Sequence, residues 1–437
     1  MKNFIIFATF TLIITLFLCL TVGAEAALPD LSGIENVYVY NMENDKELYS
    51  KSADTRVSPA SAAKMMTGVI AIEHYKDRFG EIITVSKDAL GGFKGRNINL
   101  KDGEVVTVEN LLYATICGGA NDAANVLAYS IAGSHSAFVD MMNQKANELG
   151  MNNTYYANAN GYTDSSMYTT AKDTAVLARY AFLVKEYMDI CATERYVFPS
   201  TNISKTRYVF NSNYLIATNV ENKYKNKEFQ GMNAGSTVEG GYVLVTAASR
   251  DGKTNFFVLM GGGSDEENIY TYQAIDGLSK WAYESFDYIK VIDSGEMICE
   301  IDVSLSSTVD YVVLSPETSV ELFLPTSIDV EKDIKRTVKL FDESLEAPVE
   351  AGYVAGVMTL EYEGKVIAEV DLITKNNVNR NGFLYVLARI KALTRSSKFK
   401  TTILLLVAVV VFYFVTVIYR KTRSNRYRYK YGRYKRK

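Results

Sequence analysis

Histidine is nearly absent from this chain, whose 437 residues include only His74 and His135. A Ser-His-Asp triad or a histidine-based metal site therefore has almost nothing to be built from. Cysteine is almost as scarce. One of the four cysteines lies in the N-terminal apolar run, and the other three, Cys117, Cys191 and Cys299, are an odd number without metal-ligand spacing. The sequence thus predicts neither a disulfide framework nor a metal site.

The N-terminus has the three parts of a secretory signal peptide. Met1-Lys2-Asn3 is a short positive start, Phe4–Leu20 is an apolar run, and Ala24-Glu25-Ala26 is a small-residue cleavage site. An uncleaved membrane anchor is the alternative. We predict a signal peptide over residues 1–26 and therefore an exported protein that begins at Ala27.

A second uncharged apolar run extends from Thr401 to Tyr419, close to the roughly 20 residues that a membrane-spanning helix needs. A buried core helix is the alternative, but such a helix usually has a polar face, and this run has none. Residues 420–437 then contain ten Lys or Arg and no acid. Because short loops rich in Lys and Arg stay cytoplasmic, we predict a single-pass cell-membrane protein with an extracytoplasmic body and a cytoplasmic tail.

Charge argues against nucleic acid as a partner. The net charge of the whole chain is −3, but the chain without residues 1–26 and 420–437 has 36 basic and 49 acidic residues, roughly −13. An acidic exported region gives no reason to bind nucleic acid. The basic tail, with its tyrosines, would suit RNA, but beside a membrane helix we interpret it as a topology signal and a contact for anionic lipids.

The first part of the exported region mixes strands and helices. An alternating strand at Asn36–Met42 precedes several helical patterns, and strands return at Gly241–Ala248 and Asn255–Met260 before a closing helix near Tyr272–Phe286. Strands at both ends with helices between them predict an α+β domain over residues 27–286, with an antiparallel sheet.

The second part has the pattern of short strands. The candidates are Tyr311–Leu314, Val320–Leu324, Val357–Tyr362 and Lys365–Leu372, and the last two are joined by the two-residue turn Glu363-Gly364. We predict a small β-sandwich over residues 287–375 and a linker over 376–400 that leads to the membrane helix.

The first predicted helix carries a serine and a lysine three residues apart. Ser58 is the expected N-cap, Pro59 lies in the first turn, and Ser61-Ala62-Ala63-Lys64 follows. Residues three apart share a helix face, so the Ser61 hydroxyl and the Lys64 amine can meet. A lysine can activate a serine only if burial or a nearby cation lowers its pKa towards neutrality. The alternative is a capped helix with an exposed lysine.

Longer stretches resemble one family. They are VSPASAAKMMTGVIA, DGEVVTVENLLYATICGGANDAANVLA, GMNNTYYANANGYTDSSMYTTAKDTAVLARYA, GMNAGSTVEGGYVLVTAASRDGK and EAPVEAGYVAGVMTLEYEGKVIAEVDLIT. Together they resemble the penicillin-binding D-alanyl-D-alanine carboxypeptidases, which carry S-x-x-K, S-x-N and K-T-G motifs, over nearly all of residues 30–375. The resemblance implies a penicillin-binding/β-lactamase-like transpeptidase fold, an antiparallel sheet with helices, followed by a β-sandwich. It implies no metal and no cofactor.

The resemblance also assigns roles to single residues. Ser61 matches the acylated nucleophile, Lys64 its general base, and Asn121 the second-motif asparagine that holds the substrate peptide. The expected substrate-binding residues on the third-motif strand are Asn233, Gly235 and Ser236. The backbone N–H groups of Ser61 and Ser236 would form the oxyanion hole.

Three positions depart from the family pattern. Gly119 stands where the family has a serine that relays a proton to the leaving group, and Asn233-Ala234 stands where it has Lys-Thr. In the family, this lysine and threonine recognise the substrate's C-terminal carboxylate through charge-assisted hydrogen bonds, which are worth about 1.5–3 kcal/mol each. Their loss predicts weaker recognition and, because a cation is gone, a Lys64 whose base strength is mistuned.

Five basic residues lie near the motifs and offer replacements for the missing cation. They are Lys94, Arg96, Lys223, Lys225 and Lys227. We interpret all five as solvated surface charges, with compensation as the alternative.

These observations predict a membrane-anchored serine-type D-Ala-D-Ala carboxypeptidase, a hydrolase of cell-wall biogenesis. It would trim peptidoglycan pentapeptides through a Ser61 acyl-enzyme, and β-lactams would acylate it as covalent inhibitors. One alternative is a binding or regulatory module with the same fold, catalytically impaired, that recognises cell-wall peptide. Another is a β-lactamase-like hydrolase, which shares the serine–lysine chemistry but fits poorly with the anchor and the C-terminal sandwich.

Overall fold

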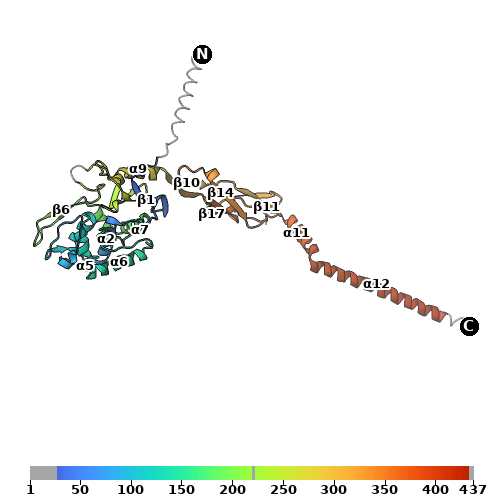
Figure 1. Cartoon of the computed structure of the whole chain (residues 1–437). Coiled ribbons are helices and arrows are strands. Elements are labelled where there is room, and N and C mark those ends of the chain that lie inside the picture. Colours follow the sequence, from blue (N-terminus) through green and yellow to red (C-terminus); the bar gives the residue numbers. More distant parts are fainter. Residues whose placement is uncertain (1–26, 219–221, 433–437) are drawn as a thin grey trace, which may run out of the picture. The chain divides into compact units, whose positions relative to one another are not determined.

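A computed structural model describes residues 27–218 and 222–432 (Figure 1). The predicted signal peptide, residues 1–26, lies outside the described residues. The chain forms two compact units. The first ends at Asp287 and also includes Phe323–Ser327, and the second comprises Tyr288–Leu322 and the chain from Ile328 onwards.

The first unit is built on a five-stranded antiparallel sheet. Its order is β2 (Lys46–Lys51), β1 (Ile34–Asn41), β9 (Lys253–Gly262), β8 (Gly241–Arg250) and β7 (Phe229–Thr237). Two short ribbons, β3 (Ile82–Thr84) with β4 (Val105–Thr107) and β5 (Arg195–Phe198) with β6 (Arg207–Phe210), lie outside this sheet. The first and last segments of the unit therefore share one sheet, and the predicted α+β fold is confirmed.

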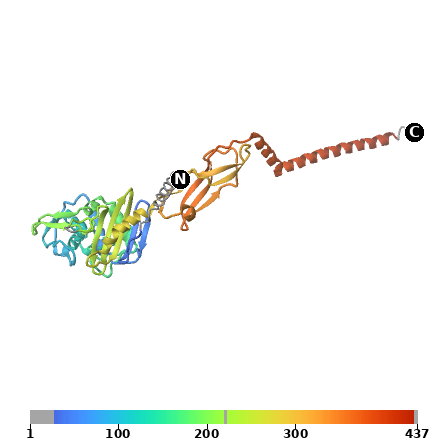
Figure 2. The same cartoon turned by 90° about the horizontal axis from the view of Figure 1, so that it is seen from above.

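Helices cover both faces of this sheet. Between β2 and β7 the chain forms η2 (Ala60–Ala62), α2 (Ala63–His74), α3 (Lys87–Leu90), α4 (Val108–Leu112), η3 (Tyr113–Cys117), α5 (Asn121–Ala132), α6 (His135–Glu148), α7 (Ala171–Phe182) and α8 (Lys185–Cys191). α9 (Tyr270–Glu284) covers the opposite face (Figure 2). Because strand side chains alternate between faces, Val258 joins the core of the helical side while Phe257 and Leu259 join the core under α9.

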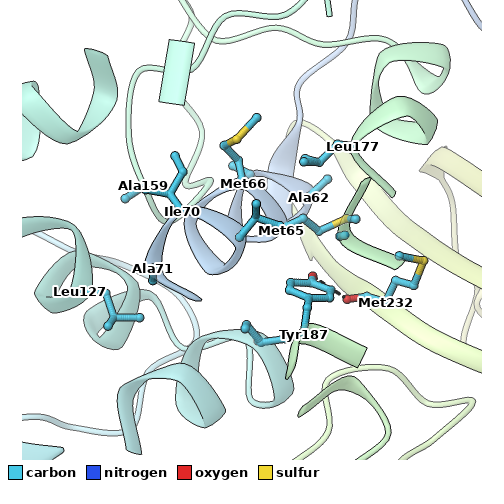
Figure 3. Packing of buried hydrophobic residues seen from close by; sticks show 14 of the residues in the cluster. Ala62, Met65, Met66, Ile70, Ala71, Leu127, Ala159, Leu177, Tyr187 and Met232 are labelled. Atoms are coloured by element: carbon cyan, nitrogen blue, oxygen red, sulfur yellow. Dashed lines mark hydrogen bonds between the residues drawn. The ribbon is translucent and has the colours of Figure 1, made fainter. Parts of the chain in front are cut away.

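Helix α2 forms the centre of the larger core. Its first ten residues are buried, because it is apolar on every side rather than along one stripe. Figure 3 shows Met65, Met66, Ile70 and Ala71 packed among Leu127 of α5, Leu177 of α7, and Tyr187 of α8, whose hydroxyl donates to the Met232 carbonyl of β7 (3.1 Å). Burying a large apolar side chain stabilises a fold by about 1.5–3 kcal/mol. Packing on all sides fixes this helix and the residues at its start.

The predicted start of this helix is wrong in one detail. Ser58 does not cap it: Pro59 precedes a 3₁₀ turn, η2, and neither η2 nor α2 has a side-chain cap. Ser58 Oγ accepts instead from the Ala60 N–H at 3.3 Å. Ala60 has φ of 44°, a left-handed conformation that costs an alanine free energy and changes the chain direction just before Ser61.

The second unit is a β domain, as predicted. A six-stranded sheet has the order β14 (Ile334–Leu340), β16 (Val354–Tyr362), β17 (Lys365–Thr374), β12 (Tyr311–Pro316), β11 (Cys299–Ser304) and β15 (Ser344–Glu346). β10 (Phe286–Ile292) pairs with β13 (Val320–Pro325), and α10 (Val330–Asp333) precedes β14. The predicted hairpin is present, and Glu363 and Gly364 have φ of 50° and 75°, the positive angles that a tight two-residue turn requires.

Two helices end the described chain. The segment expected to be a linker contains α11 (Gly382–Arg395), which is capped by the Asn381 side chain, an acceptor for the N–H groups of Phe383 and Leu384. α12 (Ser397–Gly432) follows, and its residues Ser397–Arg423 have a mean hydropathy of 2.8 in their most apolar window. By length and composition this stretch is able to cross a membrane, and it includes the predicted span Thr401–Tyr419.

Candidate active site

The first unit contains a cleft of about 610 Å³ beside the edge strand β7. Five of the six predicted site residues line it: Ser61, Lys64, Asn121, Gly235 and Ser236. They come from η2, α2, the first residue of α5, and β7. The sixth, Asn233, is buried next to the cleft and accepts a hydrogen bond from the Ser61 hydroxyl at 2.9 Å. The tertiary structure therefore brings together residues up to 175 positions apart in the sequence.

Glycines allow the backbone to pass very close to Ser61. A Cβ atom at Gly235 of β7 would lie 2.8 Å from the Ser61 Cβ, closer than real Cβ atoms come. On another side of the cleft, a Cβ atom at Gly161 would lie 1.9 Å from the Ala60 carbonyl oxygen, and Gly161 has φ of +70°. The serine therefore lies between strand β7 and the loop that contains Gly161. Both approach it so closely that only glycine fits at positions 235 and 161.

We expect Gly161→Ala to damage the site. The new methyl group must push away the carbonyl of Ala60, which precedes Ser61, and the backbone must also tolerate a left-handed alanine. A loss of about 2–4 kcal/mol in the free energy of unfolding is expected, together with strongly reduced acylation of Ser61. Urea denaturation and labelling with a serine-reactive β-lactam measure the two effects.

Gly133→Ala is the matched control. Gly133 ends α5 with a similar φ of +75°, but nothing lies within 4 Å of the position of its Cβ. This variant has the backbone strain without the clash. Its free energy of unfolding should fall by only about 1 kcal/mol, and it should still be labelled by the β-lactam. Equal effects of the two substitutions would contradict the proposed contact with Ala60.

Lys64 is a buried amine with a lowered pKa. It is 5% exposed, and its Nζ donates to the Asn160 carbonyl at 2.5 Å. Burial and, to a smaller extent, the positive charge of Arg96 together lower the pKa of Lys64 to about 7. Thr67, one turn later on the same face of α2, donates to the Ala159 carbonyl at 2.6 Å. The two hydrogen bonds hold the loop that contains Ala159 and Asn160 against the helix.

The predicted mistuning of Lys64 is therefore wrong. We expected that the loss of the third-motif lysine would leave Lys64 without a nearby cation. Desolvation is the larger cause of the shift and does not depend on that lysine, while Arg96 supplies a positive charge from a different loop. A lysine with a pKa near 7 is half neutral at neutral pH and is able to accept a proton.

Arg96 is exposed, as expected of a surface charge, but it alone of the five basic residues also lines the cleft. It lines the cleft with Ser61 and Lys64, and it forms no ion pair with any carboxylate in the described part of the chain. By contrast, Lys225 pairs with Glu194 at 2.7 Å. Sequence reasoning underrated Arg96 because no periodic pattern shows which side of a loop faces a cleft.

The loop that carries Arg96 is tied to the start of α5. The Asn121 N–H donates to the Arg96 carbonyl at 2.8 Å, and the Asn121 side-chain amide donates to the Lys94 carbonyl at 2.5 Å. The buried Asp122 carboxylate accepts from the N–H groups of Ile98 at 3.2 Å and Leu100 at 2.9 Å. Asn121 Oδ1 is left buried and without a hydrogen-bond partner among the described residues, so a substrate N–H group would find an acceptor there.

The fold thus places a serine hydroxyl and a buried lysine amine in one cleft. The sequence of residues 28–264, more than half of the chain, matches the D-alanyl-D-alanine carboxypeptidase family, and residues 286–380 match the C-terminal domain of penicillin-binding protein 5. The chain belongs to the D-alanyl-D-alanine carboxypeptidase family.

Individual proteins agree with this assignment. The D-alanyl-D-alanine carboxypeptidase DacF of Bacillus subtilis (strain 168) is 26% identical over 352 residues, covering 79% of this chain and 86% of that protein. DacC of Escherichia coli (strain K12) is 27% identical over 353 residues, covering 77% of this chain and 82% of that protein. The crystal structure of DacD from Francisella tularensis has the same fold, with a TM-score of 0.59 at 21% identity, covering 82% of this chain and 96% of that chain.

Proposed function

We propose that this protein is a serine D-Ala-D-Ala carboxypeptidase that removes the terminal D-alanine from peptidoglycan stem peptides. The observation that carries the proposal is the position of Lys64, a buried amine with a pKa of about 7 that lines one cleft with the Ser61 hydroxyl. Family membership supports the same reaction. The alternative, an impaired binding module, rests on the departures at Gly119, Asn233 and Ala234, and the lowered pKa of Lys64 removes one of its grounds, the mistuned base.

In the proposed reaction, Lys64 accepts the Ser61 proton as the serine oxygen attacks the carbonyl carbon of the penultimate D-alanine. The N–H groups of Ser61 and Ser236 stabilise the developing oxyanion. Asn121 holds the substrate peptide through its free Oδ1. The C–N bond breaks, D-alanine leaves, and water attacks the acyl-enzyme with Lys64 again acting as base. A β-lactam, which resembles the D-Ala-D-Ala end, would acylate Ser61 in the same way.

Binding of the substrate's terminal carboxylate differs from the family pattern in this proposal. Asn233 accepts from the Ser61 hydroxyl and is buried, and the methyl group of Ala234 packs in the core under α9. Neither residue offers a cation. Arg96 has no acidic partner among the described residues and lines the cleft, so it is the positive charge we assign to hold the substrate's carboxylate or to keep Lys64 neutral.

We propose a location as well. α12 would span the cell membrane with the body outside and the basic tail inside, because the Lys and Arg residues follow the apolar run. On α11 the exposed apolar residues Phe383, Val386, Leu387, Ile390 and Leu393 recur at helical spacing. A helix with such a face, directly before a membrane span, suits the lipid–water interface. The remaining layout, a signal peptide at 1–26, a catalytic domain at 27–286 and a β-sandwich at 287–375, belongs to the same proposal.

The proposal is tested on the full-length protein in detergent. We expect covalent labelling by a fluorescent penicillin, and release of one D-alanine per pentapeptide, rising with pH as Lys64 loses its proton near pH 7. Absence of both labelling and release at pH 8 would rule the function out. Labelling without release would restrict the defect to binding of the peptide's carboxylate, which the double change Asn233→Lys with Ala234→Thr should then correct.

A further inference from the structure

Ser212 is a serine of the cleft whose hydroxyl the mechanism above leaves unused. It lies on the loop after β6, is 7% exposed, and lines the cleft together with Ser61, Lys64 and Asn121. Within residues 27–218 and 222–432 its Oγ has no hydrogen-bond partner. The residue is largely buried, but its Oγ is open to the cleft and is therefore free to hydrogen-bond a group of the substrate.

The loop holds this hydroxyl rigidly. The Ser212 N–H donates to the Cys117 carbonyl at 2.7 Å, which ties it to the turn that leads into Gly119. The Asn211 side-chain amide donates to the carbonyls of Cys191 and Thr193, both at 2.9 Å. Asn213 Oδ1 accepts from the Leu215 N–H at 3.0 Å. Both neighbours of Ser212 are therefore fixed by their own side chains, and the hydroxyl needs little reorganisation to act.

Ser212 and position 119 lie side by side in the cleft. A Cβ atom at Gly119 would lie 3.3 Å from the Ser212 Cβ and 3.5 Å from its Oγ. Gly119 also has φ of +68°, which disfavours any side chain there. A hydroxyl can be supplied to this corner of the cleft from residue 212 or from residue 119, but the two crowd each other.

Cleavage of the substrate's C–N bond needs a proton donor. When the C–N bond of an amide breaks, the departing nitrogen must gain a proton, because a free amide anion is far too basic to leave. Lys64 becomes an ammonium when it takes the Ser61 proton, and it is buried on α2 with one hydrogen bond to the Asn160 carbonyl. A hydroxyl between the amine and the leaving nitrogen passes the proton on without a net change in its own charge.

We propose that the Ser212 hydroxyl delivers the proton to the departing amine of the substrate, in place of a side chain at residue 119. This inference rests on the proposed carboxypeptidase function. As the C–N bond breaks, the Ser212 proton moves to the leaving nitrogen, and the Lys64 ammonium returns a proton to the Ser212 oxygen directly or through one water. Atoms and charge balance without any further reactant. Arg96, whose Cδ lies 3.7 Å from the Cβ position at Gly119, places a cation beside this corner that favours proton release by the hydroxyl.

The test compares two substrates that differ only in their leaving group. One is an acyl-D-Ala-D-Ala peptide, whose amine must be protonated, and the other is the matching thioester, whose thiolate leaves without a proton. In full-length protein, Ser212→Ala should lower kcat/KM for the peptide by about 10- to 1,000-fold and leave kcat/KM for the thioester within about threefold of the wild type. Ser212→Thr, which keeps the hydroxyl, should recover most of the peptide activity.

Other outcomes separate this inference from the function on which it rests. Unchanged peptide activity in Ser212→Ala, or equal losses on both substrates, would overturn the role of Ser212 while leaving the carboxypeptidase intact. If the wild type cleaves neither substrate, the proposed function itself fails. Ser212→Gly provides the same comparison if the alanine variant does not fold. Ser136→Ala, which removes an exposed hydroxyl outside the cleft, serves as the control and should change neither rate.

Discussion

Replacing Ser61 with alanine is expected to abolish covalent labelling by penicillin and to lower D-alanine release by at least about 1,000-fold, because no other group in the proposed mechanism forms the acyl-enzyme. The fold should persist, since η2 and α2 are held by packing on all sides and alanine suits a helix. The substitution leaves the buried Asn233 Oδ1 without the hydroxyl that donates to it, at a cost of about 1–3 kcal/mol.

The measurement is gel fluorescence after incubation with labelled penicillin, alongside a D-alanine assay and thermal unfolding. Ser58→Ala is the matched control: Ser58 lies three residues earlier, outside the cleft lining, and its Oγ only accepts the Ala60 N–H. It should keep its labelling. Persistent labelling of a folded Ser61→Ala variant would show that another residue is the nucleophile.

Lys64→Met is expected to abolish activity and to stabilise the protein at neutral pH. Methionine has nearly the same shape but cannot accept a proton, so acylation should fall by at least about 1,000-fold. Wild-type folding must bury an amine whose pKa falls from 10.5 to about 7. Allowing for the lost hydrogen bond to Asn160, the free energy of unfolding of the variant should exceed that of the wild type by about 2–4 kcal/mol at pH 7.

The stabilising effect of Lys64→Met depends on pH because the pKa of Lys64 differs between the folded and the unfolded chain. Between pH 7 and 10.5 the unfolded chain holds a proton on Lys64 that the folded chain has released. Wild-type stability therefore rises with pH across this window. The advantage of Lys64→Met should be largest at and below pH 7 and should vanish by about pH 10.5. Urea denaturation at several pH values measures it, and a constant difference would contradict the burial of an ionisable amine.

Arg96→Gln is the control that leaves the amine in place. Arg96 contributes a positive charge that lowers the pKa of Lys64, so its removal should raise that pKa and shift the acidic limb of kcat/KM to higher pH. Burial is the larger cause and remains. The shifted limb should therefore stay well below pH 10.5, the ordinary value for lysine.

Local sequence patterns predicted the elements well where few alternatives exist. Glu363-Gly364 between two alternating strands predicted a hairpin, since a tight turn with two positive φ angles joins strands in few other ways. The spacing of Ser61 and Lys64 predicted a shared helix face, and both residues line the cleft. Ser61 lies in the 3₁₀ turn η2, however, and its hydroxyl donates to Asn233 while the Lys64 amine donates to the Asn160 carbonyl. The burial of Lys64 also had a signal, an apolar sequence on all sides of α2, which we did not use.

The sequence by itself determined the α+β and β character of the two regions, the apolar stretch long enough to span a membrane, and the family to which the chain belongs. Only the tertiary structure placed Arg96 and Ser212 in the cleft beside the altered motifs. Arg96 and Ser212 lie 116 positions apart in loops, and each faces the cleft because of backbone contacts made elsewhere, by Asn121 and by Cys117. Long-range packing sets the direction of a loop side chain, and no local pattern of residues records it.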